Sequence, residues 1–208
     1  MSERDQSNDL SHLFTETVQE TMDSSVYRAW RGIRDSDAVP LAFGFPYPDS
    51  FPNDELVSAA DSLFEIEGDR ALQYAGGEYA DALPELLVDR ARDRGMDCTT
   101  DEIHLTNGAT NAIDTVCQTF LDPGDTVIVE APTFMGALRL FRNYGVDIDD
   151  VKMDEAGLDI EAFAASLAAR EATGDPLPKL LYTIPNFHNP TGVTLTEERR
   201  ERLIELAV

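Results

Sequence analysis

From residue 102 onward, apolar segments alternate between strand-like and helix-like spacing, and this alternation constrains the fold more than any other feature. Strands are predicted at 102–106, 126–130, 146–153 and 179–185, and helices at 111–121, 135–145, 158–170 and 194–208. Short loops join these segments, so the sequence predicts an α/β fold in which a mainly parallel sheet carries helices on both faces. Ligands of such sheets bind beyond the carboxyl ends of the strands, and the loops found there are therefore the first place to look for chemistry.

The first hundred residues have a different pattern. Residues 10–34 are interpreted as a polar helix or arm, and 41–52 as an irregular, packed loop rich in proline and aromatic residues. A helix capped by Asn53 or Asp54 is predicted to run to about Gly68, and a second helix is predicted at about 80–94.

The last predicted helix opens with a capping box from Thr194 to Glu197. An alternating domain rarely finishes on such a helix without a further strand. We therefore expect these residues to be part of a longer chain.

The charge balance argues against several classes of partner. Forty acidic residues face sixteen basic ones, which gives a net charge of −24. Phosphates would be repelled, so neither nucleic acid nor a membrane surface is predicted as a partner. The acids are scattered along the chain, as a solvated surface requires. The size of the net charge favours adaptation to a salt-rich cytoplasm over an ordinary acidic enzyme, because concentrated salt screens the repulsion among the acids.

Residues 1–14 lack the apolar core of a signal peptide, and no apolar run reaches membrane-spanning length. A soluble cytoplasmic protein is therefore expected.

Cys98 and Cys117 form no CxxC pair and have no histidine at metal-ligand spacing, so neither a metal site nor a disulfide framework is predicted. Cys117 is expected to be a buried small apolar residue.

Two loops that follow predicted strands carry candidate binding residues. At 106–111 a glycine and small residues precede a helix, whose first backbone N–H groups would bind an anion; a simple helix cap is the plainer alternative. At 130–134 Phe134 would project from a strand end and stack on a flat ring, although a single Phe is more often a core residue.

A third loop, at 184–192, holds Asn189 between prolines. Pro190 forces Asn189 out of helical geometry, so its amide is held in an extended loop. The Asn189–Pro190 bond can be cis, and an Asx-type turn is the plainer alternative for this segment. His188 is interpreted as structural and is given no proton-transfer role. Tyr74 lies in a glycine-rich segment that on its own reads as a surface loop.

Taken together, these segments resemble the class I/II aminotransferases of pyridoxal-phosphate (PLP) fold type I. The similarity is greatest to the group that contains 2-aminoadipate (LysN-like) and kynurenine aminotransferases and the aminotransferase-like domain of MocR regulators. A MocR regulator itself is disfavoured, because the N-terminal arm is too short and too acidic for a DNA-binding domain. The segments that carry the resemblance occur in the family's order: GFPYPDSFP, LQYAGGEY, LTNGATNAID, FLDPGDTVIVEAPTFMGAL and LLYTIPNFHNPTGVTLTEERR.

The resemblance implies a role for each matching residue. Gly108, Ala109 and Thr110 would line the cofactor phosphate site, Phe134 would stack on the pyridine ring, and Asn189 would donate to the phenolic oxygen O3′. Tyr74 would reach the cofactor phosphate of a partner subunit, which implies a homodimer, and Gly44 would approach the substrate carboxylate. Residues 1–52 would form an arm and loop that contribute to the small domain, and 53–208 the N-terminal part of the large PLP-binding domain.

The family's Schiff-base lysine is expected beyond residue 208, since neither Lys152 nor Lys179 matches its context. The parent enzyme would exchange the amino group of an amino acid with a 2-oxo acid, and residues 1–208 alone would be inactive. Two alternatives stay open. The fold could serve another PLP reaction, such as that of a lyase or decarboxylase, or the chain could be a non-catalytic paralogue or dimerisation partner. The aromatic residues around Gly44 (Phe43, Phe45, Tyr47 and Phe51) favour a large or apolar substrate side chain.

Overall fold

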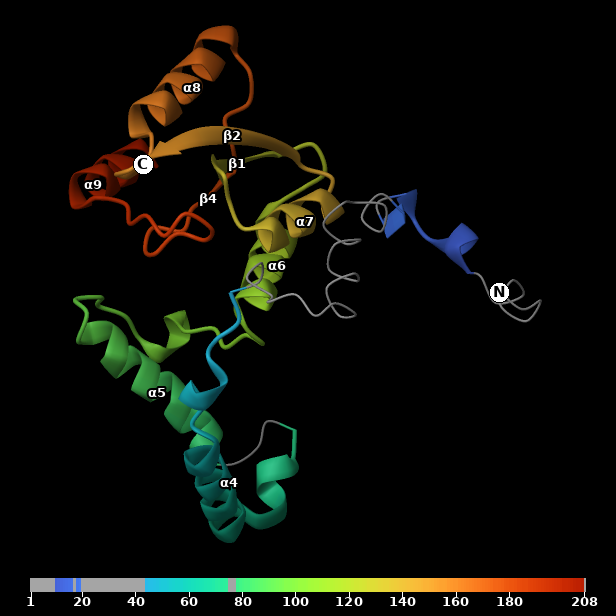
Figure 1. Ribbon diagram of the computed structural model, residues 1–208, viewed down its shortest axis with the longest axis vertical. Helices are drawn as coiled ribbons and strands as arrows, with labels where there is room; N and C mark the ends of the chain where they lie inside the picture. The colour runs from blue at the N-terminus through green and yellow to red at the C-terminus, as the bar shows by residue number, and fades with distance from the viewer. Residues whose placement is uncertain (1–9, 17, 20–43, 75–77, 208) are drawn as a thin grey trace. The chain divides into compact units, whose positions relative to one another are not determined.

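A computed structural model of the chain describes residues 10–16, 18–19, 44–74 and 78–207 (Figure 1). Contacts divide the chain into two units, one within Asp35–Thr106 and the other within Met1–Arg34 and Asn107–Val208. Most of the predicted arm at 10–34, including Trp30, lies outside the described residues, as do Phe43 and the glycines at 76 and 77. The predicted domain boundary after residue 52 stays a prediction.

The second unit is built on a four-stranded sheet in the order β3-β2-β1-β4. The strands are β1 (Thr126–Ala131), β2 (Asp147–Asp154), β3 (Gly157–Leu158) and β4 (Leu180–Tyr182). Strand β1 pairs in parallel with β2, from Thr126 opposite Asp147, and with β4, from Val127 opposite Leu180, while only the short β2–β3 pair is antiparallel. The predicted mainly parallel sheet is confirmed.

Helices cover both faces of this sheet, as the alternation in the sequence predicts. They are α6 (Ala109–Phe120), α7 (Met135–Asn143), α8 (Ile160–Thr173) and α9 (Glu197–Leu206). Side chains of successive β1 residues point to opposite faces. Val127 and Val129 are buried in one apolar cluster with residues of α6 and α7, and Ile128 is buried in a second cluster that α8 and α9 help to form. Each of these three side chains stabilises the fold by about 1.5–3 kcal/mol through burial.

The α6–α7 cluster also accounts for Cys117, which is fully buried as predicted. Tyr144 follows α7 and donates a 2.7 Å hydrogen bond to Asp114 of α6, so the two helices are joined by a polar contact as well. This hydrogen bond, followed by burial, raises the pKa of Tyr144 to about 12.

The first unit contains α4 (Asn53–Glu67), the 3-10 helix Gly68–Leu72, α5 (Glu78–Arg92) and the 3-10 helix Thr100–Glu102. The two predicted helices are confirmed, but the predicted cap is wrong: Asn53 is the first helical residue of α4, Pro52 is its N-cap, and no side chain caps the helix. Apolar side chains of α4 such as Leu56, Val57 and Ile66 are exposed.

Two further sequence predictions for the first unit are wrong. The predicted strand at 102–106 is absent, because Thr99 and Glu102 form a capping box for a 3-10 turn and the residues after it are irregular. The aromatic loop was expected to be packed, yet the described Phe45, Tyr47 and Phe51 are exposed. Within it, Pro48–Ser50 form a 3-10 turn, and the Tyr47 hydroxyl bonds to the nearby Asp49 and not to the core.

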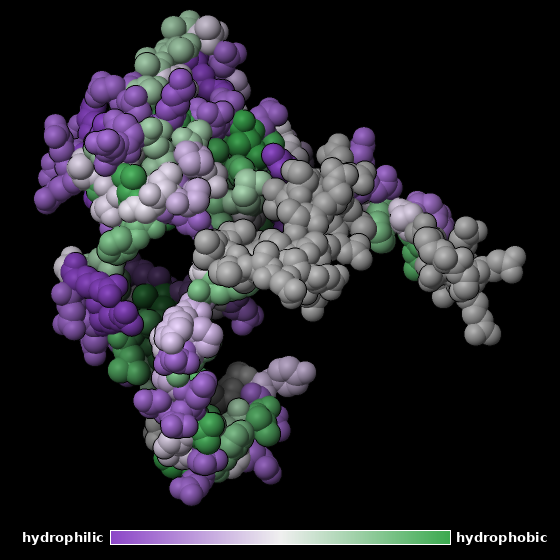
Figure 2. Space-filling model, in the orientation of Figure 1, coloured by the Kyte–Doolittle hydropathy of each residue, from purple (hydrophilic) through white to green (hydrophobic). Residues whose placement is uncertain are grey.

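The final helix begins later than predicted. Helix α9 starts at Glu197 with Thr196 as its N-cap, and no side chain caps it. Thr194 does not form the predicted capping box because its hydroxyl oxygen accepts the backbone N–H of Phe187 at 3.1 Å. The residue thus fastens the preceding loop. Hydrophilic side chains gather over α9 on the surface (Figure 2).

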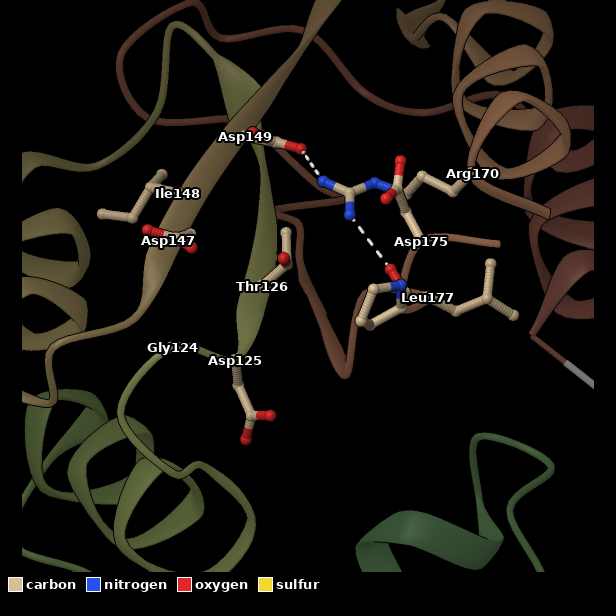
Figure 3. Close-up of a pocket in the computed structure, with 10 residues that line it drawn as sticks. Gly124, Asp125, Thr126, Asp147, Ile148, Asp149, Arg170, Asp175 and Leu177 are labelled. Carbon is tan, nitrogen blue, oxygen red and sulfur yellow. Dashed lines mark hydrogen bonds and ion pairs between the residues drawn. The ribbon is translucent and has the colours of Figure 1, made fainter. Parts of the chain in front are cut away.

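A cavity of about 540 Å³ lies at the amino ends of β1 and β2 (Figure 3). Asp149 faces Arg170 there, and Arg170 also donates to the carbonyl oxygen of Pro176. This edge is opposite to the one at which ligands of parallel sheets bind.

None of the described helices combines the length and the apolar character that crossing a membrane requires.

Candidate functional site

The carboxyl edge of the sheet collects the three loops that the sequence marks. Strands β1 and β4 run in parallel, so the residues that follow Ala131 and Tyr182 leave the sheet at the same edge. Helix α6 precedes β1 through a short turn, and its N-terminal end therefore returns to this edge. Ile113 of α6 and Phe134 pack against the same apolar cluster, which places the start of α6 close to the loop after β1.

The N-terminus of α6 has the features of an anion site. Gly108 is the N-cap with φ +83°, a conformation that strains any residue with a Cβ. No side chain caps the helix and no acidic residue lies in its first turn. Within the described residues, the N–H groups of Ala109 and Thr110 have no protein acceptor, and both residues are exposed. Free donors and the helix dipole together favour a bound anion.

Phe134 is held in place by its neighbour in α7. It is the N-cap of that helix and is half-buried against the apolar cluster. A Cβ on Gly136 would lie 2.4 Å from the Phe134 ring, so the glycine leaves the space that the ring occupies. Phe134 can therefore be both a core residue and a residue that stacks on a flat ring, because part of its side chain packs inward while part stays accessible.

Asn189 is exposed and follows a fully buried residue. The Asn189–Pro190 bond is cis, as is Ala131–Pro132 in the loop that carries Phe134. Within the described part of the chain, the Asn189 side chain makes no hydrogen bond, so its amide is available to a ligand. His188, by contrast, has only 1% of its surface exposed, which agrees with its interpretation as a structural residue.

A buried carboxylate lies beneath this loop, and the sequence analysis missed it. Glu130 is 1% exposed at the end of β1. It accepts a 2.7 Å hydrogen bond from the Thr183 hydroxyl and a 2.8 Å bond from the Ile184 N–H, and Nε2 of His188 lies 3.1 Å from its Oε2. The His188–Glu130 contact is within ion-pair distance, but its geometry does not meet the criteria for a hydrogen bond. The available signal was an acidic residue that closes the otherwise apolar strand TVIVE.

Comparison with known proteins identifies the family. The sequence pattern described as aminotransferase class I and II matches residues 39–208. The chain belongs to the class I and II aminotransferases. It is 32% identical to aromatic-amino-acid aminotransferase 1 of Thermococcus litoralis over 96% of this chain and 48% of that one. It is 34% identical to 2-aminoadipate transaminase of Thermus thermophilus over 82% of this chain and 40% of that one.

Solved aminotransferases share the fold. The kynurenine aminotransferase of Pyrococcus horikoshii, solved with PMP, superposes with a TM-score of 0.85 at 33% identity and covers 97% of this chain and 50% of that one. The α-aminoadipate aminotransferase LysN of Thermus thermophilus, solved with N-(5'-phosphopyridoxyl)-L-leucine, gives a TM-score of 0.72 at 32% identity, covering 95% and 46%. The chain therefore spans about half the length of these aminotransferases.

Only part of the site predicted for an aminotransferase lies in one unit of this chain. Gly108, Ala109, Thr110, Phe134 and Asn189 all belong to the unit with the sheet, whereas Tyr74 and Gly44 belong to the other unit. Tyr74 is exposed, and Gly44 has φ +58° with open space around its Cβ position. Their predicted roles stay predictions.

The two lysines of the chain differ in position. Lys179 pairs with Asp125 at 3.0 Å at the amino edge of the sheet, away from the candidate site. Lys152 is exposed on β2 opposite Ala131. Within the described residues, no hydrogen bond or ion pair joins either lysine to Asn189.

Proposed function

We propose that the protein to which this chain belongs moves an amino group between an amino acid and a 2-oxo acid with the help of PLP. Family membership supports the reaction class. The observation that carries the proposal is the gathering of an uncapped helix start, an aromatic ring and a free amide at one sheet edge. Those are the three kinds of group that a phosphorylated pyridine requires.

The residues present fit this cofactor. The free N–H groups of Ala109 and Thr110, with Gly108 before them, suit a phosphate dianion. The Phe134 ring offers a face for a flat heterocycle, and the Asn189 amide offers a donor for a phenolic oxygen. When bound, PLP supplies an electron sink for chemistry at the amino acid Cα. The residues of this chain bind and orient it.

The remaining groups are proposed to come from elsewhere. An amine that binds the cofactor covalently and moves a proton is needed, and we propose that it lies in residues that follow 208, together with an arginine that binds the substrate carboxylate. Tyr74 is proposed to complete the phosphate site of a partner subunit, which makes the working protein a homodimer. We further propose that the protein is cytoplasmic and adapted to high salt, as its charge suggests.

The substrate is inferred to have a large or apolar side chain. Phe45, Tyr47 and Phe51 lie near Gly44 in sequence and present exposed rings. Two of the similar proteins are named for aromatic amino acids and for kynurenine, which is itself aromatic. A 2-aminoadipate transaminase is also among them, so the side-chain class needs a direct assay.

The test begins with the intact mass of the protein isolated from its native cell, followed by an assay of amino transfer. We expect a mass well above 23 kDa, and transfer from aromatic amino acids to a 2-oxo acid. The purified 208-residue chain should give no turnover, and turnover by it would show that the required amine lies within these residues. A native mass of 23 kDa would instead favour a non-catalytic paralogue or dimerisation partner. Release of carbon dioxide or elimination products without amino transfer would indicate a lyase or decarboxylase.

A further inference from the structure

The exposed Asn189 lies in a loop that hydrogen bonds and buried contacts hold in place. His188 donates its backbone N–H to the carbonyl of Val193 at 2.8 Å, and Phe187 donates to Thr194 at 3.1 Å. Phe187 has φ +47°, an uncommon conformation for an aromatic residue, and its side chain is 84% exposed. Such a conformation persists only where surrounding contacts fix it. The bond from Phe187 to Thr194 and the buried contacts of the adjacent His188 supply such contacts here.

Hydrogen-bond donors around the His188 ring determine where its proton lies. The Thr191 hydroxyl oxygen accepts the Val193 N–H at 3.3 Å, which leaves the hydroxyl hydrogen for Nδ1 of His188, 3.0 Å away. The Thr191 N–H also donates to Nδ1, at 3.4 Å. Because Nδ1 accepts, the ring proton of a neutral imidazole is on Nε2, the nitrogen that faces Glu130.

Glu130 joins this ring to both strands. Its Oε1 accepts from Thr183 and its Oε2 from the Ile184 N–H, at the first residues after β4. Glu130 itself belongs to β1. One buried carboxylate therefore connects the end of β1, the end of β4 and the loop that carries Asn189. Removing a partner of a buried charge is costly, so the ring is strongly held at this position.

We propose that His188 is a positioning residue for Asn189, acting through the buried contact of its Nε2 with Glu130. The inference rests on the proposed function, since Asn189 is there assigned to the cofactor. Asn189 follows His188 directly, so the fixed ring sets where the Asn189 backbone starts and where its amide lies. A Gln at this place would keep a side-chain N–H for Glu130 and should preserve the effect.

The first experiment uses NMR on the cofactor-free 208-residue protein. Two-bond proton–nitrogen correlations of the imidazole should show His188 as the Nε2–H tautomer. T191V changes an exposed residue and should shift that tautomer equilibrium while leaving the fold intact. The Asn189 side-chain amide should give one sharp pair of signals in the wild type and in H188Q, and broadened or doubled signals in H188L. H104L, the same change at an exposed histidine of the other unit, is the matched control and should leave Asn189 unaffected.

The second experiment titrates the same proteins with PLP and follows the Asn189 signals. We expect H188L to weaken PLP binding about five- to tenfold, the loss that accompanies one misplaced hydrogen bond, and H188Q to stay within about twofold. Circular dichroism and the thermal midpoint establish that each variant is folded. If H188L does not fold, the positioning role is tested by the two other variants: H188Q through its Asn189 signals, and T191V through its His188 ring and Asn189 signals.

The outcomes separate the two proposals. Unchanged Asn189 signals in folded H188L would overturn the positioning role, as would an Nδ1–H tautomer in the wild type. If PLP leaves the wild-type Asn189 signals unmoved, the cofactor role of Asn189 fails, and the cofactor-free spectra still decide whether His188 positions it. Sharp signals in H188Q together with disturbed signals in H188L would support the positioning role.

Discussion

At the scale of single residues, Gly136 controls the placement of Phe134. A methyl group at position 136 would lie 2.4 Å from the ring, so Gly136→Ala must displace the aromatic side chain. Alanine favours a helix over glycine, and only the far end of one side chain has to move, so stability should change by less than about 1 kcal/mol. We expect weaker PLP binding with a nearly unchanged thermal midpoint, measured by titration and by calorimetry.

Met135→Ala is the matched control for this prediction, because Met135 is exposed in the same turn of α7. It should bind PLP as the wild type does. Equal affinity in G136A and the wild type would mean that the ring does not contact the cofactor.

The sequence indicated the exposed members of the candidate site more readily than the buried ones. Phe134 and Asn189 follow strands and Gly108 precedes a helix, all in recognisable loops, so local patterns were enough to select them. Glu130 was overlooked because its role depends on Thr183 and His188, which are more than fifty residues away. A contact between distant segments leaves no local period, and only the parallel pairing of β1 and β4 brings these groups together.

At the scale of helices and strands, Arg199 ties α9 to the β2–β3 hairpin. It donates two 2.7 Å hydrogen bonds to the carboxylate of Asp154, and it also bonds to the carbonyl oxygens of Gly157 and Leu158. The hydrogen bonds from Arg199, followed by the backbone N–H of Ala156, lower the pKa of Asp154. This contribution to stability is therefore present above the unfolded pKa of about 3.9 and is lost as the pH falls through the lower folded value.

Asp154→Asn should remove the pH-dependent contribution of this carboxylate to the free energy of unfolding. In urea unfolding, the wild type should be more stable than D154N at pH 7, and the difference should shrink as the pH falls below about 4. Asp150→Asn is the control, because Asp150 is exposed on the same strand and forms no ion pair among the described residues. A difference between wild type and D154N that stays constant from pH 7 to pH 2 would contradict the proposed linkage.

Element boundaries were predictable wherever local signals had no competitor. Helices α6, α7 and α8 and strands β1 and β2 lie within a few residues of their predicted limits. The prediction failed where a residue had two possible partners, as at Thr194, whose hydroxyl binds Phe187 in place of a helix end. It also failed at 102–106, which is not part of the four-stranded sheet among the described residues, because a strand forms only where neighbours pair with its backbone.

At the scale of the whole molecule, net charge should control stability. A charge of −24 on 208 residues produces self-repulsion that favours expanded states. Charges separated by more than the Debye length are screened, and that length falls from about 10 Å at 0.1 M salt to about 3 Å at 1 M. We therefore expect the thermal midpoint to rise steeply between 0.1 M and 2 M KCl.

The same repulsion should weaken when negative charges are removed without loss of contacts. Glu85, Glu171 and Glu201 are exposed and form no ion pair within the described residues. Changing all three to Gln should raise the midpoint at 0.1 M KCl and reduce its dependence on salt, while both proteins converge at 2 M. Sucrose favours the folded state because it is excluded from the protein surface, and it does not screen charge. It should stabilise the two proteins equally, which distinguishes charge screening from this exclusion effect. If the wild type and the triple variant respond to KCl with equal slopes, self-repulsion does not limit the fold, and the acidic surface has another cause.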